Sequence, residues 1–378
     1  MKIHLFTNTY TKEDIVAITS FSNSYADKII EFCKKWFVAK ENIFELQTSG
    51  STGIPKTIAI TRQQMQASAE MTAQKLQLGA GTKALLCLQA EYIGGKMMLV
   101  RAMHKDWELF VVSPTNLPFA NIDTTIKLDF VALVPTQLQQ TLELMPEKIA
   151  LLNQMQAIIV GGAAISVSLE KLIQKHLTVP VYSTYGMTET ISHIALKQIN
   201  PIQNNFSNTT YFSLLPNIEV DVDIRNCLKI KGLVTNNLWI QSNDLVKLEY
   251  DRNRNIVGFS YLGRVDNVIN SGGVKIQVEK VEQQIEEILC NLGMQNRLLL
   301  LGIPDNFWGE KLVLLIEDSA WNQEKIDFIM AKMATKITKY EIPKEIYFFE
   351  KFIETPTAKI NRKENYKRII AKLNNLAS

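Results

Sequence analysis

The chain has 378 residues, 46% of them hydrophobic and 21% charged, and its 41 basic and 38 acidic side chains give a net charge of +3. This length exceeds what one hydrophobic core usually serves, so we expect two domains. The near-neutral balance, without a concentrated block of Lys and Arg, gives no electrostatic basis for nucleic-acid binding.

The 4 cysteines and 4 histidines are scattered, with no C-x-x-C pair and no zinc-like spacing. Such usage is typical of reduced thiols in a cytosolic protein. The N-terminus lacks the continuous apolar core of a secretory signal, and no apolar run approaches the roughly 20 residues that span a bilayer. We therefore expect a cytoplasmic protein without membrane insertion.

Short apolar segments alternate with amphipathic ones through the first part of the chain. This alternation is typical of an α/β domain with a largely parallel sheet. The pattern predicts helices over residues 63–76 and 136–144, and buried strands over 84–88, 109–112, 130–134 and 157–160.

The pattern changes after residue 200. Polar residues 200–210 are interpreted as a surface loop, and residues 220–259 have the character of short strands with a hairpin tip at 251–255. A further change near 264–267 predicts a domain boundary. The segment beyond it predicts a small α+β unit with helices over 278–289 and 326–337 and strands over 297–301 and 311–316.

The first chemical signal is a loop of small hydroxyl and glycine residues that ends in a lysine. Such residues let backbone N–H groups and hydroxyls surround phosphate oxygens. Pro55 stands where a Walker A loop needs glycine, so an ordinary P-loop NTPase is disfavoured. The alternative interpretation is a polar turn. The candidate phosphate ligands are Thr48, Ser49, Gly50, Ser51, Thr52, Gly53 and Lys56.

The second signal is the segment 183–190, in which a tyrosine suits a base, a threonine a phosphate, and a glutamate Mg²⁺. Upstream, residues 161–163 end an apolar run and offer bare backbone to a flat ligand. Taken alone, the second segment fits an ordinary strand end and loop better than a binding site.

Two further segments are weaker in isolation. Asp244 followed by Arg264 suits a ribose diol next to phosphates, but taken alone the pair is better explained by a surface salt bridge. Residues 356–363, which contain Lys359, are by themselves an ordinary basic loop.

In this order, the four segments resemble the AMP-forming acyl-CoA synthetases, whose superfamily also holds peptide-synthetase adenylation domains and firefly-type luciferases. The shared segments are TSGSTGIPK, YGMTET, GRVDNVINSGGVKI and PTAKINRK, and they span residues 48–363. The resemblance implies a large N-terminal domain with mainly parallel sheets, residues 1–265. It also implies a small α+β C-terminal lid, residues 266–378, joined at a hinge near Asp266.

The resemblance also implies roles for single residues in binding ATP, Mg²⁺ and coenzyme A. The loop 48–56 would hold the β- and γ-phosphates, and Lys359 would be the catalytic lysine of the first half-reaction. The other implied residues are Gly161, Gly162, Ala163 and Tyr185 around adenine with Gly186 and Met187 beside them, Thr188 at the α-phosphate, Glu189 as the Mg²⁺ ligand, Asp244 and Arg264 at the ribose, and Gly272, Gly273 and Lys275 along the CoA tunnel.

Short members of the family resemble o-succinylbenzoate–CoA ligases of menaquinone synthesis, which sets our expectation for the substrate. Residues 89–101 stand where the acyl-pocket helix begins, and Gly94 and Gly95 would leave room beside Tyr92 for an aromatic ring. Lys96 or Arg101 would pair with the substrate's second carboxylate through a charge-assisted contact. That both are solvated helix residues is equally compatible with the sequence.

Three features depart from the family pattern. Ala358 replaces the usual glycine of the lysine loop, and Ser-Asn-Asp replaces the usual Thr-Gly-Asp around Asp244. The phosphate loop begins at Thr48, whereas most members carry a much longer region before it. These departures concern the lysine loop, the ribose contact and the far wall of the acyl pocket.

Two alternative functions belong to other classes of protein. An amino-acid-adenylating module for a carrier protein usually has an aspartate where this chain has Tyr92, and an assay of pyrophosphate exchange with amino acids would identify it. A non-catalytic nucleotide-binding homologue needs no catalytic lysine, so retention of Lys359 together with Glu189 and Asp244 argues against it.

Overall fold

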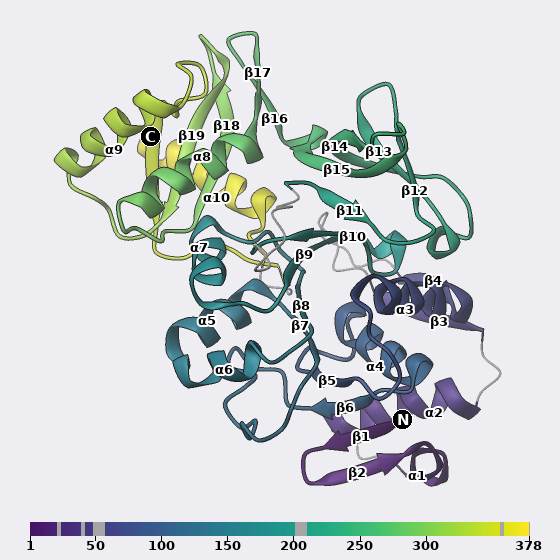
Figure 1. The fold of residues 1–378 in the computed structure, drawn as a ribbon. Helices are drawn as coiled ribbons and strands as arrows, with labels where there is room; N and C mark the ends of the chain where they lie inside the picture. The colour runs from purple at the N-terminus through teal and green to yellow at the C-terminus, as the bar shows by residue number, and fades with distance from the viewer. Residues whose placement is uncertain (21–23, 39–41, 48–56, 201–209, 356–358, 378) are drawn as a thin grey trace.

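The computed structural model describes residues 1–20, 24–38, 42–47, 57–200, 210–355 and 359–377 (Figure 1). Its strands form a 13-stranded sheet, a 5-stranded sheet and the 2-stranded ladder of β3 (Ile43–Gln47) and β4 (Thr57–Thr61). The larger sheet with its helices and the smaller sheet with its helices occupy different ends of the molecule in Figure 1.

Six parallel strands form one continuous part of the larger sheet. Their order is β9-β8-β7-β5-β6-β1, and β2 (Asn8–Thr11) adds an antiparallel edge. The predicted α/β fold is confirmed, and the four predicted strands occur within a residue or two of their expected bounds. The six are β1 (Lys2–Leu5), β5 (Lys83–Leu86), β6 (Glu108–Val111), β7 (Phe130–Leu133), β8 (Ala157–Val160) and β9 (Val181–Gly186).

Both faces of this parallel region are buried, as parallel sheets require. Successive residues of one strand enter opposite cores: Ile158 packs on one face and Ile159 on the other. One face carries α2 (Tyr25–Val38), α3 (Arg62–Leu76) and α4 (Ile93–Lys105), while the short α1 (Lys12–Ala17) follows β2. The other face carries α5 (Pro135–Leu144), α6 (Ile149–Leu152) and α7 (Val167–His176).

Antiparallel strands extend the sheet beyond β9. The long hairpin of β14 (Ile240–Tyr250) and β15 (Ile256–Arg264) turns at 251–255, as the sequence predicts. Its register pairs Asp244 with Arg264, which brings two predicted site residues together. The other antiparallel strands are β10 (His193–Gln198), β11 (Phe212–Leu214), β12 (Glu219–Val222) and β13 (Cys227–Lys231).

A 3₁₀ turn, η4 (Val265–Asn267), leads from β15 into the smaller sheet. The predicted helices and strands of this unit are confirmed, whereas β20 and α10 follow no prediction. Division into domains at residues 265 and 266 stays a prediction. The elements are β16 (Val268–Ser271), β17 (Val274–Gln277), α8 (Val278–Asn291), β18 (Leu298–Asp305), β19 (Gly309–Glu317), α9 (Gln323–Lys336), β20 (Glu345–Phe349) and α10 (Arg362–Ala377).

Helix α8 of the smaller unit packs against α7 of the larger one. The Glu286 carboxylate accepts a hydrogen bond from the Val167 backbone N–H at 3.1 Å, and Lys171 Nζ donates to Asn291 Oδ1 at 2.8 Å. Because Val167 begins α7, the acidic side chain also faces the positive end of that helix dipole. In the described part of the chain, no helix has the length and apolar character of a membrane span.

Candidate functional site

The β14–β15 hairpin and the end of β9 bring three predicted ATP-binding residues into contact. Arg264 Nη1 lies 3.4 Å from Asp244 Oδ1, and the Tyr185 hydroxyl donates to Asp244 Oδ2 at 2.5 Å. Burial, followed by the negative charge of Asp244, raises the pKa of Tyr185, so the phenol stays a donor. Asp244 is therefore fixed from two sides.

Aromatic rings surround Tyr185. The Phe259 ring meets it edge-on with centroids 4.8 Å apart, and Phe212 and Tyr261 lie at 5.7 and 6.3 Å. Edge-to-face pairs of this kind restrict ring orientation. The sequence indicated a binding role for Tyr185 but not for the three aromatic residues around it, because only their position in strands could be predicted.

The loop after β8 runs close against β9. A Cβ added to Gly161 would lie 2.3 Å from Thr184 Oγ1, so a side chain there would force a displacement. Gly162 has a φ of +88°, a conformation that favours glycine, and both it and Ala163 are exposed. The loop after β8 therefore presents exposed backbone beside β9.

The segment after β9 makes a 3₁₀ turn, η2 (Thr188–Thr190). Glu189 is exposed on this turn, and Thr188 is half-buried. Within the described ranges, no group of three or more His, Cys, Asp and Glu could hold a metal ion. Mg²⁺ is usually held by one or two carboxylates together with nucleotide phosphates, so a single exposed glutamate fits that ion.

Lys359 lies next to the antiparallel bridge between Glu354 and Ile360. Its carbonyl accepts from the Thr355 N–H at 2.8 Å, and its own N–H donates to Thr355 Oγ1 at 3.2 Å. Surrounding protein removes water from the ammonium and lowers the pKa of Lys359, although the residue as a whole is exposed. No described residue forms an ion pair with this ammonium. The predicted phosphate loop, Thr48 to Lys56, and Ala358 lie outside the described residues.

The predicted hinge and tunnel residues follow β15. Arg264 bridges the carboxylates of Asp244 and Asp266. Its Nη1 lies 3.4 Å from Asp244 Oδ1, and its Nη2 lies 2.9 Å from Asp266 Oδ2. Gly272 and Gly273 form the two-residue turn between β16 and β17 with φ of +58° and +81°, and Lys275 is exposed beyond them. Nothing in the described contacts joins this turn to Lys359.

The start of α4 holds the predicted acyl-pocket residues. Tyr92 is the exposed N-cap residue, Gly94 is exposed, and Gly95 is buried so closely that a Cβ would lie 2.3 Å from the Gln89 carbonyl oxygen. Lys96 Nζ lies 5.5 Å from the centre of the Phe32 ring. Desolvation lowers the pKa of Lys96.

Arg101, two turns further along α4, is 1% exposed. Its Nη2 donates to Ser192 Oγ at 3.1 Å, Nη1 has only a weak contact with Met98 Sδ at 3.7 Å, and Nε has no partner in the described part of the chain. Among the described residues, no carboxylate pairs with it. Burial lowers the pKa of Arg101 to about 10, which leaves the guanidinium charged at neutral pH.

Three polar residues beside Arg101 were not singled out from the sequence: Thr72, Ser192 and His193. His193 is buried, and Ser192 follows the η2 turn by two residues. The available signal was their position, because Ser192 and His193 directly continue the YGMTETI segment. Gly186 approaches them so closely that a Cβ would lie 2.4 Å from the Ser192 carbonyl oxygen.

We expect the buried His193 to make the fold sensitive to acid. Burial and the charge of Arg101 lower the pKa of His193 well below 6.5, whereas the unfolded chain protonates it near 6.5. The unfolded state then binds more protons, so the free energy of unfolding falls as pH decreases, by up to roughly 1.4 kcal/mol per pH unit. Urea unfolding between about pH 5 and pH 7 will show a shallower decline for His193→Gln; equal slopes contradict this.

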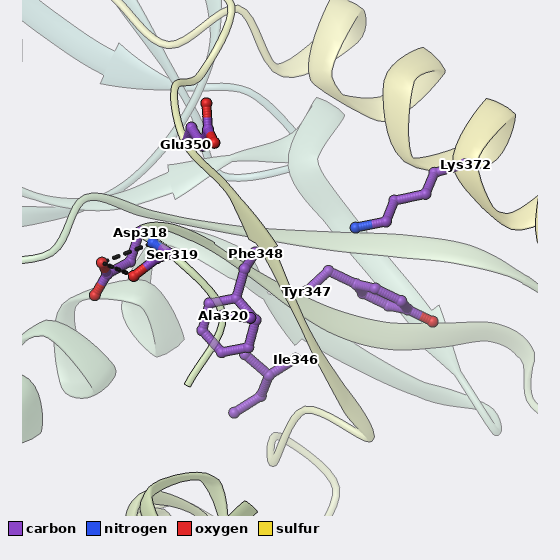
Figure 2. Close-up of a pocket in the computed structure, with 8 residues that line it drawn as sticks. All are labelled: Asp318, Ser319, Ala320, Ile346, Tyr347, Phe348, Glu350 and Lys372. Carbon is purple, nitrogen blue, oxygen red and sulfur yellow. Dashed lines mark hydrogen bonds between the residues drawn. The ribbon is translucent and has the colours of Figure 1, made fainter. Parts of the chain in front are cut away.

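The smaller unit contains a pocket of about 360 Å³. Figure 2 shows the side chains that line it, among them Tyr347 on β20 and Lys372 on α10. None of its lining residues is a predicted site residue. Asp318 there already accepts from Trp321 Nε1 and Asn296 Nδ2. We assign this pocket no part in the reaction. Its lining is Asp318, Ser319, Ala320, Ile346, Tyr347, Phe348, Glu350 and Lys372.

Comparison with known proteins places the sequence among adenylate-forming enzymes. The sequence pattern of the family described as "AMP-binding enzyme" matches residues 18–243. A 2-succinylbenzoate–CoA ligase of Bacillus cereus is 26% identical over 352 residues, which cover 87% of this chain and 70% of the relative.

Two solved structures are informative. An acyl-CoA synthetase (AMP-forming)/AMP-acid ligase II-like protein from Dyadobacter fermentans is 40% identical, with a TM-score of 0.62, covering 95% of this chain and 98% of its own. The o-succinylbenzoate coenzyme A synthetase of Bacillus subtilis, solved with ATP and a magnesium ion, is 20% identical with a TM-score of 0.68. That match covers 84% of this chain and 68% of the other, and it shows a shared fold.

Proposed function

The chain belongs to the AMP-binding enzyme family, and we propose that it joins o-succinylbenzoate to coenzyme A through an acyl-adenylate, a step of menaquinone synthesis. It is an AMP-forming acid–CoA ligase that uses ATP, Mg²⁺ and coenzyme A. The choice of acid goes beyond family membership. It rests on one observation, the buried guanidinium of Arg101.

A buried charge without a counter-ion costs several kcal/mol, so its retention needs a reason. A carboxylate is the natural partner, because a guanidinium donates two parallel hydrogen bonds to it. Arg101 contacts Ser192, which lies two residues after the turn that carries Thr188 and Glu189. An acid held there with its reacting carboxylate near the α-phosphate would therefore present a second carboxylate to Arg101.

Lys96 is a weaker candidate for this contact. It lies over the Phe32 ring, and the nearby Glu91 carboxylate already compensates part of its charge. Arg101 has no such carboxylate among the described residues. We therefore assign the second carboxylate of o-succinylbenzoate to Arg101, and the ring of the substrate to the space beside Gly94 and Gly95.

In the first half-reaction, a carboxylate oxygen of the acid attacks the α-phosphorus of ATP. The bond from that phosphorus to the bridging oxygen breaks, and diphosphate leaves. Both reactants are anions, so positive charge must lie between them. Lys359 supplies it, Thr188 donates to the α-phosphate, and the loop from Thr48 to Lys56 holds the departing phosphates. Glu189 would hold Mg²⁺ together with the phosphates, and the bound ion would supply further positive charge there.

The nucleoside occupies the surface around Tyr185 and Asp244. Adenine lies between Tyr185 and the exposed backbone of residues 161–163, with Gly186 and Met187 beside it. The carboxylate of Asp244 accepts from the ribose hydroxyls, and Arg264 holds that carboxylate in place at 3.4 Å. The close approach of Gly161 to Thr184 supports this arrangement because it leaves the loop's outer edge bare.

In the second half-reaction, the sulfur of coenzyme A attacks the acyl carbon, the bond from that carbon to the AMP oxygen breaks, and AMP leaves. We propose that residues 266–378 form a lid that turns at Asp266 between the half-reactions. Gly272, Gly273 and Lys275 then line the path of the pantetheine arm, while Lys359 withdraws. Such closure also keeps water from the adenylate.

The Asp244 contacts lead to a graded prediction. Tyr185→Phe removes one hydrogen bond to the carboxylate, and we expect the KM for ATP to rise about threefold to tenfold. Asp244→Ala removes the ribose acceptor and leaves Arg264 without this partner, so the increase should be larger. Initial rates at varied ATP concentration measure both. The assignment is wrong if neither substitution changes the KM for ATP.

The proposed acid is tested with two substrates. We expect the kcat/KM for o-succinylbenzoate to exceed by about tenfold or more the kcat/KM for the analogue that lacks only the ring carboxylate, because one charge-assisted contact is lost. Formation of the CoA thioester, followed at equal enzyme concentration, gives both values. Equal values would remove the basis for a second carboxylate.

A further inference from the structure

Four polar side chains, from α3, α4 and the start of β10, form one hydrogen-bonded chain. Arg101 Nη2 donates to Ser192 Oγ at 3.1 Å, and Ser192 Oγ lies 3.3 Å from His193 Nδ1. On the other side of the imidazole, His193 Nε2 lies 3.1 Å from Thr72 Oγ1, and Thr72 donates to the Ser68 carbonyl at 3.0 Å. Thr72 is on α3, Arg101 on α4 and His193 on β10.

The direction of every hydrogen bond follows from the two ends. Thr72 gives its proton to Ser68, so it must accept from His193 Nε2–H. Ser192 accepts from Arg101, so its own proton is free for His193 Nδ1. His193 is then neutral with its proton on Nε2, since an imidazolium offers no acceptor to Ser192. The lowered pKa of His193 agrees with this assignment.

The hydrogen bonds from Thr72 through His193 to Ser192 hold the Arg101 guanidinium without neutralising its charge. An acidic partner for Arg101 would compete with an incoming carboxylate and cancel the charge that attracts it. A neutral hydroxyl orients one nitrogen only. Among the described residues Nε has no partner, and Nη1 has only the weak contact with Met98 Sδ. Ser192 uses one hydrogen of Nη2, so the other Nη2 hydrogen, together with Nε or Nη1, forms an edge without a strong partner in the described structure, as two parallel hydrogen bonds to a carboxylate require.

We propose that Ser192, His193 and Thr72 are positioning residues that orient Arg101 for the second carboxylate of the acid, so that selectivity for a dicarboxylate depends on side chains that do not touch it. This inference rests on the proposed function. It extends that proposal from one contact residue to the buried chain behind it. It also gives a role to the serine and the histidine that lie just beyond the proposed nucleotide-binding turn.

Thr72→Val tests the far end of the chain with an isosteric change. We expect the ratio of kcat/KM for o-succinylbenzoate to kcat/KM for the analogue without the ring carboxylate to fall about threefold to tenfold, because His193 loses its acceptor. Thr141→Val is the matched control. Thr141 is also fully buried and donates to a helix carbonyl, that of Gln137 at 2.7 Å, but it lies on α5 and contacts no member of the chain. Its ratio should stay unchanged.

His193 itself is tested by a disruptive and a conservative change. His193→Phe should lower the same ratio by about tenfold or more, whereas His193→Gln, which can accept from Ser192 and donate to Thr72, should restore most of it. Thermal melts of each variant identify loss of folding. If His193→Phe does not fold, Thr72→Val decides.

The outcomes separate the two proposals. If Thr72→Val and His193→Phe lower both kcat/KM values by the same factor, these residues are merely structural and the positioning role is wrong. If the wild-type enzyme and Arg101→Met differ in the ratio but the other variants match wild type, only the positioning role fails. If wild type does not distinguish the two acids, the proposed substrate fails and the positioning role with it.

Discussion

Replacing Lys359 by alanine will slow formation of the acyl-adenylate by about 10²–10³-fold, the usual cost of removing one charge-stabilising donor from an active site. The ammonium has no ion-pair partner among the described residues, and desolvation strengthens its interaction with anions. ATP binding should persist, because Asp244, Arg264 and Tyr185 hold the nucleoside. Isotope exchange between diphosphate and ATP in the presence of the acid measures the first half-reaction alone.

The second half-reaction supplies the contrast. Given purified acyl-adenylate and coenzyme A, Lys359→Ala should form the thioester at nearly the wild-type rate, because AMP is already a good leaving group. Lys363→Ala is the matched control, since Lys363 is an exposed lysine in the same basic segment, on α10. Equal loss of both half-reactions in Lys359→Ala would show that the lysine has another role.

Arg101→Met should reduce selectivity for the dicarboxylate while making the protein more stable. Loss of a charge-assisted hydrogen-bond pair from a buried site lowers kcat/KM for o-succinylbenzoate by roughly tenfold to a hundredfold or more. The same change removes an unpaired buried charge, whose replacement by a hydrophobic side chain of similar size is often stabilising by about 1 kcal/mol or more. Steady-state kinetics and thermal melts measure the two effects.

Opposite changes in activity and stability are the sign of a residue retained for function. Lys96→Met is the matched control on the same helix: its charge is half-buried over Phe32, so neither selectivity nor Tm should change much. A lower Tm for Arg101→Met with unchanged selectivity would instead make Arg101 a structural residue. An equal loss of selectivity in both variants would show that Lys96 shares the contact.

The sequence predicted the fold where local patterns are strong. Residues 157–160 are fully apolar and lie between two buried faces, so their strand was predictable from the run alone. The hairpin tip at 251–255 was marked by turn residues, and it sets the register that pairs Asp244 with Arg264. By contrast, α10 begins at Arg362 in a segment whose basic character indicated only a loop, because its packing partners on β18 and β20 are distant in sequence.

The site was predictable only in part. Family resemblance named Tyr185 and Asp244, and the structure brings them into contact; the roles of the individual site residues stay predictions. The burial of Arg101 could not be foreseen, since a charged residue on a helix is usually solvated and only the packing of α4 against α3 and the larger sheet removes it from water. In the sequence, His193 is one of 4 scattered histidines, and its hydrogen-bond partner Thr72 lies 121 positions away, so no local pattern indicates the pair.

The central claim is tested most directly by measuring diphosphate release with ATP, Mg²⁺ and coenzyme A against a panel of acids that includes o-succinylbenzoate, its analogue without the ring carboxylate, other aromatic acids and amino acids. We predict release with o-succinylbenzoate, accompanied by its CoA thioester, and much slower release with the rest. Release with another acid but none with o-succinylbenzoate would contradict the proposed substrate, and release with no acid at all would contradict the proposed function.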